Sequence, residues 1–369
     1  MINRLLLLSF LCLFALGIRA GIQTTDKIVI SDLTVVPGGD AAYFDVSLQG
    51  SDVIYTAFEV SLQMPEGLDV DYYNGELDVA LRKVSGSVYP FTEDRDGNKT
   101  YYHTLSCSYG VIGDGILKVM VYSNQNKDFI ATSGVLFRVY VKASPFMKPG
   151  KAKIVSSNVF FATKEEVQYD IQPSEFDVVS VDNQSTVTLS VSKTNKWSSC
   201  VLPFDAALPE GVKAYMFGSE NGDYVVLREA QAFDAFTPYL VYSENGYSGS
   251  LSGTVDATQY VEVATDGLLN GAVKQQQVTE GYVMQNKGDG VKFYNVNGKS
   301  FTIPAGKCWL SVASGAKQSY GFTFETDGIG GVEAESVADK AVYSLDGRLV
   351  ENPQSGYIYI IGGKKMIKK

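Results

Sequence analysis

The sequence reads Ala42-Tyr43-Phe44-Asp45-Val46-Ser47-Leu48 near its start, and every second residue of this stretch is apolar. Successive side chains of a β-strand point to opposite faces of its sheet, so the alternation is typical of a strand with one buried face. Residues 56–64 repeat the pattern one strand later. Further strand-like runs lie at 116–122, 135–141, 187–191, 224–227 and 239–242.

Turn-forming pairs separate these runs. The chain holds eleven Asn-Gly or Asp-Gly steps, among them Asn74-Gly75 and Asp96-Gly97, and such pairs close tight hairpins because they tolerate positive φ angles. No helical stripe of apolar residues extends beyond two turns. We therefore expect an all-β fold, with two antiparallel β-sandwich domains in tandem and a short C-terminal β-hairpin segment.

The first twenty residues have the features of a secretory signal. A short positive start precedes a fourteen-residue apolar run from Leu5 to Ile18, and the small residue Ala20 stands at the cleavage position. A membrane span needs about 20 apolar residues, so this run is too short for an anchor. The sequence predicts a protein that is secreted or held on the outer cell surface, with the periplasm as the alternative, and no transmembrane segment after signal removal.

Two changes in composition divide the rest of the 369 residues. One is the polar step at 182–185, and the other is the glycine-rich run at 327–331. A piece below about 40 residues is rarely stable alone, so the last segment should dock on a neighbour or act as a signal. Its strand and turn pattern predicts two hairpins, at 342–350 and 357–369. The predicted division is a signal over 1–20, a first β-sandwich over 21–181, a second β-domain over 182–325, a linker over 326–340 and a β-tail over 341–369.

Charge and residue content exclude several classes of function. The formal net charge is −10, which argues against nucleic acid and anionic membrane surfaces, because both call for basic patches. His103 is the one histidine of the chain. It lies four residues from Cys107, so on one strand the two side chains share a face but are about 13 Å apart, too far for a Cys–His pair. The residues predict no catalytic site, no metal site and no cofactor.

After signal removal three cysteines remain, at positions 107, 200 and 308. An odd number leaves at least one free thiol in an exported protein. Cys200 and Cys308 fall in the same predicted domain, but spacing alone does not determine whether they pair. No two cysteines have the spacing of metal ligands.

The N-terminal segment resembles the cohesin-like β-sandwiches over about residues 27–165. The residues that carry this resemblance are Leu33-Thr34-Val35-Val36-Pro37-Gly38-Gly39, then Phe58-Glu59-Val60-Ser61-Leu62-Gln63-Met64-Pro65-Glu66-Gly67-Leu68, and later Gly134-Val135-Leu136-Phe137-Arg138-Val139-Tyr140-Val141. Cohesins bind dockerin modules, and their relatives include carbohydrate-binding sandwiches. The resemblance therefore implies a binding module with a protein partner or a glycan.

The other two segments resemble parts of exported proteins of Bacteroidetes. The middle segment is similar to a β-domain of unknown function through Trp197-Ser198-Ser199-Cys200-Val201-Leu202-Pro203-Phe204 and Thr237-Pro238-Tyr239-Leu240-Val241. The tail resembles a type IX secretion sorting domain through Val342-Tyr343-Ser344-Leu345-Asp346-Gly347-Arg348 and the run from Gly356 to Lys365, without the usual Pro-Asn-Pro opening. The resemblance implies a surface or secreted protein of such a bacterium.

Two tyrosine pairs are candidate sugar-binding residues. Pyranose rings stack on exposed aromatic faces, and one member of each adjacent pair must point outward on a strand. The pairs are Tyr72 with Tyr73, and Tyr101 with Tyr102. The alternative is that these rings line the wet face of a sheet or cap its core. The acidic segment at 93–98 is interpreted as a hairpin tip with solvated charges rather than a calcium loop.

These observations favour a non-catalytic, exported binding protein. The first hypothesis is protein–protein binding through a cohesin-like module at the cell surface, for which we expect a flat, mixed polar and apolar sheet face. The alternative is a carbohydrate-binding accessory protein, for which we expect an exposed row of coplanar rings. A glycoside hydrolase is the third hypothesis, since 41 acidic residues leave room for two carboxylates in a groove. The ligand, the partner and the oligomeric state are not determined by the sequence.

Overall fold

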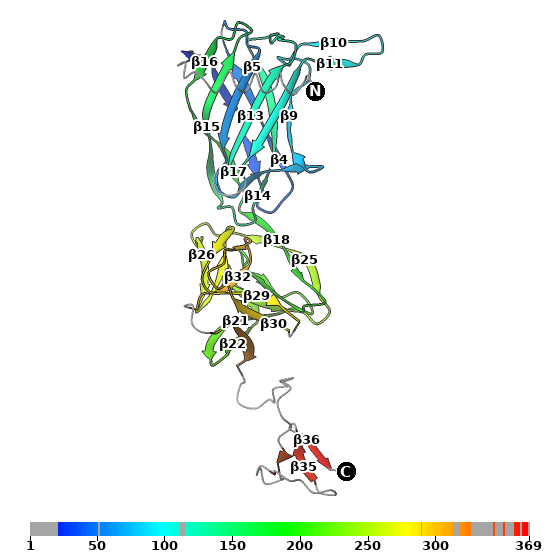
Figure 1. Ribbon diagram of the computed structural model, residues 1–369, viewed down its shortest axis with the longest axis vertical. Coiled ribbons are helices and arrows are strands. Elements are labelled where there is room, and N and C mark those ends of the chain that lie inside the picture. The colour runs from blue at the N-terminus through cyan, green and yellow to red at the C-terminus, as the bar shows by residue number, and fades with distance from the viewer. Residues whose placement is uncertain are drawn as a thin grey trace. The chain divides into compact units, whose positions relative to one another are not determined.

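Every element of the described part of the chain is a β-strand (Figure 1), which confirms the all-β fold. Accordingly, the described residues contain no helix that could cross a membrane. The contacts of the chain divide it into two compact units, Met1–Glu325 and Thr326–Lys369. The predicted signal, residues 1–20, lies outside the described residues, and the domain boundaries within the larger unit remain predictions. The computed structural model describes residues 21–50, 52–110, 115–288, 290–312 and 317–325, and in the tail 342–343, 350, 358–361 and 364–367.

The first half of the larger unit packs two sheets around one core. One sheet has the strand order β1-β16-β15-β5-β13-β12, and β17 connects β15 to β3 at its side. The other sheet has the order β2-β4-β14-β6, with β9 also paired to β14. The strands of the two sheets are β1 (Ile22–Gln23), β2 (Lys27–Ile30), β3 (Leu33–Val35), β4 (Ala42–Gln49), β5 (Ala57–Gln63), β6 (Leu68–Val70), β9 (Val79–Leu81), β12 (His103–Tyr109), β13 (Ile116–Ser123), β14 (Ser133–Ala143), β15 (Gly150–Ala162), β16 (Gln168–Ile171) and β17 (Glu175–Val181).

The predicted alternation fills the core between these sheets. Phe44, Val46 and Leu48 of β4 are buried, and the residues between them lie on the opposite face. Phe58 of β5 stacks on Phe137 of β14 from the other sheet, with 5.8 Å between ring centroids. Burial of such side chains is the dominant stabilising contribution to folding, and the period-two pattern therefore determines which face of each strand is covered.

Two short hairpins extend from the sheets at predicted turns. Between β7 (Tyr72–Tyr73) and β8 (Glu76–Leu77), Asn74 and Gly75 have φ angles of 52° and 83°. Two positive φ angles in a two-residue loop suit the twist of a hairpin, which explains the Asn-Gly pair. The second hairpin, β10 (Phe91–Glu93) with β11 (Lys99–Tyr101), projects from the body of this half (Figure 1).

The second half of the larger unit is built on a ten-stranded sheet with the order β19-β24-β21-β22-β33-β30-β29-β32-β27-β26. Three further pairs, β18–β25, β20–β23 and β28–β31, accompany it. Most strand pairs of the chain are antiparallel, but β22–β33, β1–β16 and β3–β17 are parallel. The strands are β18 (Gln184–Val191), β19 (Trp197–Cys200), β20 (Ala206–Ala207), β21 (Lys213–Asn221), β22 (Tyr224–Ala230), β23 (Ala232–Phe233), β24 (Tyr239–Tyr242), β25 (Tyr247–Thr254), β26 (Val263–Asp266), β27 (Leu269–Ala272), β28 (Gln276–Val278), β29 (Tyr282–Asn286), β30 (Val291–Asn295), β31 (Phe301–Ile303), β32 (Cys308–Leu310) and β33 (Ser319–Phe324).

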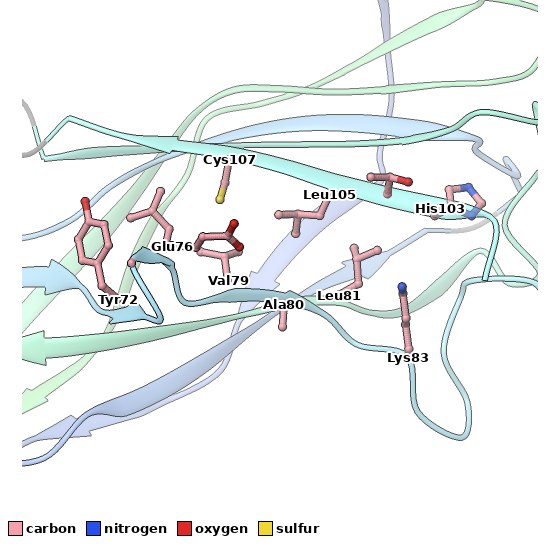
Figure 2. Close-up of a pocket in the computed structure, with 12 residues that line it drawn as sticks. Tyr72, Glu76, Val79, Ala80, Leu81, Lys83, His103, Leu105 and Cys107 are labelled. Atoms are coloured by element: carbon pink, nitrogen blue, oxygen red, sulfur yellow. The ribbon is translucent and has the colours of Figure 1, made fainter. Parts of the chain in front are cut away.

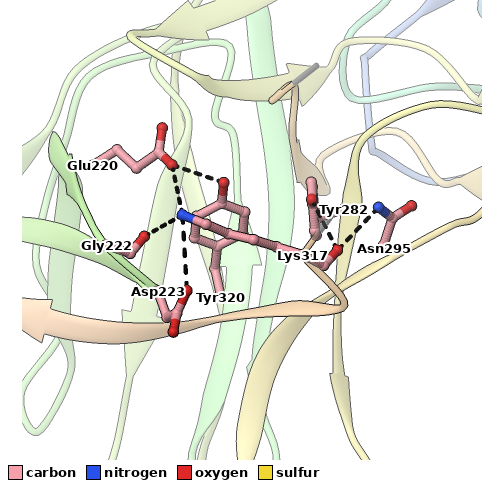
Figure 3. A network of polar contacts seen from close by, with 7 residues as sticks. All are labelled: Glu220, Gly222, Asp223, Tyr282, Asn295, Lys317 and Tyr320. Carbon is pink, nitrogen blue, oxygen red and sulfur yellow. Dashed lines mark hydrogen bonds and ion pairs between the residues drawn. The ribbon is translucent and has the colours of Figure 1, made fainter. Parts of the chain in front are cut away.

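A polar network holds the start of β33 against its neighbours (Figure 3). The Lys317 amine donates to the carbonyl oxygen of Gly222 at 2.5 Å and to the Glu220 carboxylate at 3.3 Å. The Tyr320 hydroxyl donates to the same carboxylate at 2.7 Å, and the Tyr282 hydroxyl donates to the backbone oxygen of Lys317 at 3.2 Å. Partly exposed ion pairs contribute little stability, so the network mainly orients the strand.

The loop between β14 and β15 contacts both halves of the larger unit. Met147 is buried in the core of the first half, while its neighbour Phe146 is buried in the core of the second half. The Ser185 hydroxyl donates to the carbonyl oxygen of Pro145 at 2.7 Å. Two consecutive side chains thus anchor the same loop in two separate hydrophobic cores.

The smaller unit contains a three-stranded sheet with the order β34-β35-β36. Its strands are β34 (Val342–Tyr343), β35 (Ile358–Ile361) and β36 (Lys364–Ile367). The antiparallel β35–β36 pair is the second of the two predicted hairpins. β34 pairs with β35, and most of the partner predicted for it at 348–350 lies outside the described residues.

Candidate functional site

Four strands of the first half, β15, β5, β13 and β12, present an open sheet face that we call the outer face. The core-facing residues of β5 are Phe58, Val60 and Leu62, so Glu59, Ser61 and Gln63 point the other way. Side chains of directly paired residues share one face of a sheet, so the strand register identifies the outer-face residues of β12, β13 and β15. The outer face consists of Glu59, Ser61 and Gln63 of β5, Thr104, Ser106 and Ser108 of β12, Lys118, Met120 and Tyr122 of β13, and Val155, Ser157 and Phe160 of β15.

A carboxylate lies at the centre of the outer face between two apolar side chains. Glu59 is paired with Met120 of β13 on one side and with Phe160 of β15 on the other. Partial burial raises the pKa of the Glu59 carboxyl, and the positive charge of Lys118 opposes this effect. The hydroxyl oxygen of Ser61, one row further, is buried without a hydrogen-bond partner. The centre of the face therefore combines apolar contact area with a partly desolvated acid.

A second feature of this half is a groove of about 780 Å³ between the edges of the two sheets, which we call the side groove (Figure 2). Figure 2 shows Leu105 and Cys107 of β12 pointing toward β8 and β9, and Leu81 pointing back toward β12. Glu76 lies at the Cys107 end of the groove and Lys83 at the His103 end. The lining residues are Tyr72, Gly75, Glu76, Leu77, Val79, Ala80, Leu81, Lys83, His103, Thr104, Leu105 and Cys107.

His103 is buried at one end of this groove. Only 2% of its surface is exposed, and its ring lies 5.3 Å from that of Tyr89 and 5.0 Å from that of Phe129. Its Nε2 atom lies 3.0 Å from the backbone oxygen of Thr56. Burial lowers the pKa of His103, and the hydrogen bond to Thr56 opposes this effect. Cys107 lies four residues further along the same strand and on the same face, as expected.

We predict that acid destabilises the chain through His103. The pKa of His103 is below its ordinary value of about 6.5 when the chain is folded, so the unfolded chain binds more protons as the pH falls. The contribution of His103 to the free energy of unfolding should therefore be constant above about pH 7.5 and decrease as the pH falls below about 6.5. Urea unfolding of the wild type and His103→Gln at several pH values measures this, and the single histidine C2-proton NMR signal reports the folded pKa. A histidine that titrates at or above about pH 6.5 in the folded chain would contradict the prediction.

The structure separates the two predicted tyrosine pairs. Tyr72 and Tyr73 form β7, with 51% and 69% of their surfaces exposed, and Tyr72 lines the side groove. Tyr101 belongs to β11, and its hydroxyl donates to the backbone oxygen of Lys83 at 3.0 Å. Tyr102 follows and lies under the Lys127 amine, 5.3 Å from the ring centroid. Their role in binding stays a prediction.

The aromatic ring that packs on Tyr101 is not coplanar with it. Phe91 lies opposite Tyr101 across the β10–β11 hairpin, with 5.3 Å between ring centroids and an interplanar angle of 46°. The tip of this hairpin is closed by Asp94, whose carboxylate accepts hydrogen bonds from the backbone of Asp96 and Asn98, both at 2.9 Å. These bonds fit the predicted hairpin tip. Among the described residues, no group of three or more histidine, cysteine, aspartate or glutamate side chains is placed so that it could hold a metal ion.

The three cysteines of the described chain are free thiols. Cys308 donates through its sulfur to the backbone oxygen of Cys200 at 3.4 Å, and both residues are fully enclosed. Burial raises the pKa of the Cys308 thiol to about 12, and that of Cys200 further still. Cys107 is half-buried, and burial together with the charge of Glu76 raises the pKa of its thiol.

Sequence reasoning missed the centre of the outer face. Glu59 lies within an apolar strand, and a charged residue at such a position could have indicated a candidate functional site. Its neighbours Met120 and Phe160 come from strands about sixty and one hundred positions away, and their pairing depends on the register of the sheet.

Comparison with known proteins gives structural likeness only. No family model matches the chain, and no curated protein matches it. A non-cellulosomal cohesin from the hyperthermophilic archaeon Archaeoglobus fulgidus is similar at 11% identity and a TM-score of 0.27, over 43% of this chain and 91% of the cohesin. The cohesin module of a family 33 glycoside hydrolase from Clostridium perfringens is similar at 12% identity and a TM-score of 0.30, over 42% of this chain and 96% of the module. A type II cohesin domain from the cellulosome of Acetivibrio cellulolyticus is similar at 10% identity and a TM-score of 0.28, over 42% of this chain and 96% of the cohesin domain.

Proposed function

We propose that the chain is an exported, non-catalytic binding protein that holds a protein partner on the outer face. The observation that carries this proposal is the row of Met120, Glu59 and Phe160 at the centre of an open sheet. Protein interfaces combine a desolvated centre of apolar side chains with a polar rim. The serine and threonine side chains of β12 supply such a rim on one side of the row.

The chemistry of the row also indicates what the partner offers. Partial burial of the Glu59 carboxylate carries a desolvation cost that a cationic partner side chain would offset. Arginine fits this position well because its guanidinium pairs with a carboxylate through two hydrogen bonds and its flat face packs on apolar groups. We therefore expect a partner that places an arginine or lysine between Met120 and Phe160.

The test starts from capture on the immobilised full chain. Proteins are captured from a surface extract of the organism that carries the gene, the retained protein is purified, and its affinity is measured by surface plasmon resonance. Met120→Lys should weaken binding by about tenfold or more, because truncating or charging a central contact costs at least about 1.4 kcal/mol. Glu59→Gln should weaken binding and reduce its dependence on salt.

The matched control is Val29→Lys, which places the same charge on the other sheet of the sandwich, at a half-buried position of β2. This variant should bind as the wild type does. Equal affinity of Met120→Lys and the wild type would remove the outer face from the proposal, and the absence of any retained protein would favour the glycan alternative.

Glycan binding is the second candidate function, and the exposure of Tyr72 and Tyr73 on β7 supports it. Exposed rings of this kind offer stacking faces for pyranose sugars. Affinity electrophoresis of the full chain through gels that contain a panel of polysaccharides is the test. Retardation that Tyr73→Ala abolishes, and that Met120→Lys leaves unchanged, would establish this function and locate it.

The place of action belongs to the same proposal. The apolar run that starts at Leu5 suits a protein that works outside the cytoplasm, on the cell surface or beyond it. The similarity of the tail to a sorting domain supports export through the outer membrane. Fractionation of the producing cells with an antibody against the chain tests this location.

A further inference from the structure

Within the described ranges, β12 has one edge that no strand occupies. It pairs with β13, and among the described residues it pairs with no other strand. The backbone N–H of Gly110 donates to the oxygen of Ile116 at 3.2 Å, just beyond the end of the strand pair. Hydrogen-bonded and non-bonded residues alternate along an antiparallel pair, so the N–H and C=O groups of Leu105, Cys107 and Tyr109 point away from β13.

The sequence of this edge contains none of the residues that usually block pairing, and the strand has no bulge. Natural edge strands are blocked by lysine, proline, a bulge or an inward-pointing charge. β12 reads His-Thr-Leu-Ser-Cys-Ser-Tyr over seven residues, with no proline, lysine or arginine, and its pairing to β13 has no register shift. The edge borders the side groove, whose apolar lining from Leu105, Val79 and Leu81 gives side chains a place to bind.

We propose that the side groove binds an extended peptide segment of a partner protein, which adds to β12 as an antiparallel strand. Strand addition derives affinity from backbone hydrogen bonds and specificity from pockets for every second side chain. The groove volume of about 780 Å³ lies within the range of about 300–1,000 Å³ that is usual for ligand sites. The surface is distinct from the outer face, because the side chains of Leu105 and Cys107 lie on the opposite face of β12 from Ser106 and Ser108, and Thr104 is the one β12 residue that borders both.

The charges at the two ends of the groove define the direction of the segment. Glu76 lies at the Cys107 end and Lys83 at the His103 end (Figure 2). An antiparallel segment begins at the Cys107 end, since β12 runs from His103 to Tyr109. The segment should therefore carry a basic residue near its start, an acidic residue near its end and apolar residues at alternate positions between them.

The test uses the Cys107 thiol of the full chain as a reporter. Alkylation by iodoacetamide is followed at Cys107 by peptide mapping, while the enclosed thiols of Cys200 and Cys308 serve as internal references. The probe is the capped peptide Lys-Thr-Val-Thr-Val-Thr-Glu, which places Lys, both Val and Glu on the groove side. At saturating concentration the peptide should slow alkylation several-fold.

Three comparisons separate strand addition from other contact. The peptide with N-methylated valines lacks the N–H groups that would face β12 and should give no protection. The charge-exchanged peptide Glu-Thr-Val-Thr-Val-Thr-Lys should protect less, and Glu76→Gln, at an exposed position, should narrow this difference. Leu105→Lys should abolish protection, whereas Ser106→Lys, which lies on the other face of the same strand, should leave it unchanged.

Several outcomes would overturn the proposal. Equal alkylation rates with and without the peptide would remove the groove as a peptide site. Equal protection by the N-methylated peptide would assign the effect to apolar contact alone. Protection that rises with protein concentration in the absence of peptide would assign the edge to a second copy of the chain. Each result is independent of whether Met120→Lys affects the partner on the outer face.

Discussion

Replacing Phe146 by alanine is expected to lower the free energy of unfolding by about 3–5 kcal/mol, the usual loss when a buried phenylalanine is truncated. Phe146 is 4% exposed and packs in the core of the second half, although its loop belongs to the first half. A Cβ atom placed on Gly306 would lie 3.4 Å from the Phe146 ring, so the ring packs directly against the backbone of Gly306. The substitution leaves a cavity there that the strands around it cannot fill.

The same substitution should also uncouple the two halves. Met147 keeps its place in the first core, so the loop loses only one of its two anchors. Urea unfolding followed by tryptophan fluorescence reports the second half, since Trp197 and Trp309 both lie there, and circular dichroism reports the whole chain. We expect the two probes to give coincident transitions for the wild type and separate ones for the variant.

Phe146→Leu is the matched control, because it keeps most of the apolar volume and should lose much less stability. A loss below about 1 kcal/mol for Phe146→Ala would show that the ring is not packed in the second core. Coincident transitions in the variant would show that other contacts couple the halves, such as the ion pair between Lys274 and Glu66 at 2.9 Å.

The second large effect is expected at Tyr55. Its hydroxyl donates to the Asp26 carboxylate at 2.5 Å, and both residues are buried, at 0% and 4% exposure. Burial and the nearby carboxylate raise the pKa of Tyr55, so it remains a donor at any ordinary pH. Tyr55→Phe removes the donor and leaves the carboxylate inside the protein, which should lower the free energy of unfolding by about 1.5–3 kcal/mol.

Tyr109→Phe is the matched control for Tyr55→Phe. The Tyr109 hydroxyl donates to the Asp69 carboxylate at 2.9 Å, but this bond is exposed to water, which can replace the lost donor. Its removal should therefore cost about 0.5–1 kcal/mol. Chemical denaturation of the two variants side by side measures the difference, and equal losses would contradict the idea that burial determines the cost.

The strands of the first half were predictable because the period-two pattern is local. The alternation over residues 42–48 predicts both the strand and which of its faces is buried. The Asn74-Gly75 pair likewise predicts the type of turn that it forms. The candidate tyrosines were also found locally, but adjacency in sequence does not place two rings in one plane. Tyr72 reaches the side groove and Tyr101 is tied to Lys83, because β7 and β11 belong to different hairpins.

The sequence by itself therefore established the strand content and many of the turns, both of which depend on neighbouring residues. Only the tertiary structure placed Glu59 between Met120 and Phe160, left the edge of β12 open and inserted Phe146 into the second core. These features depend on pairing between strands that are far apart in the chain. A shift of one residue in such a pairing turns every side chain to the other face, and the local pattern does not determine which distant strand becomes the neighbour.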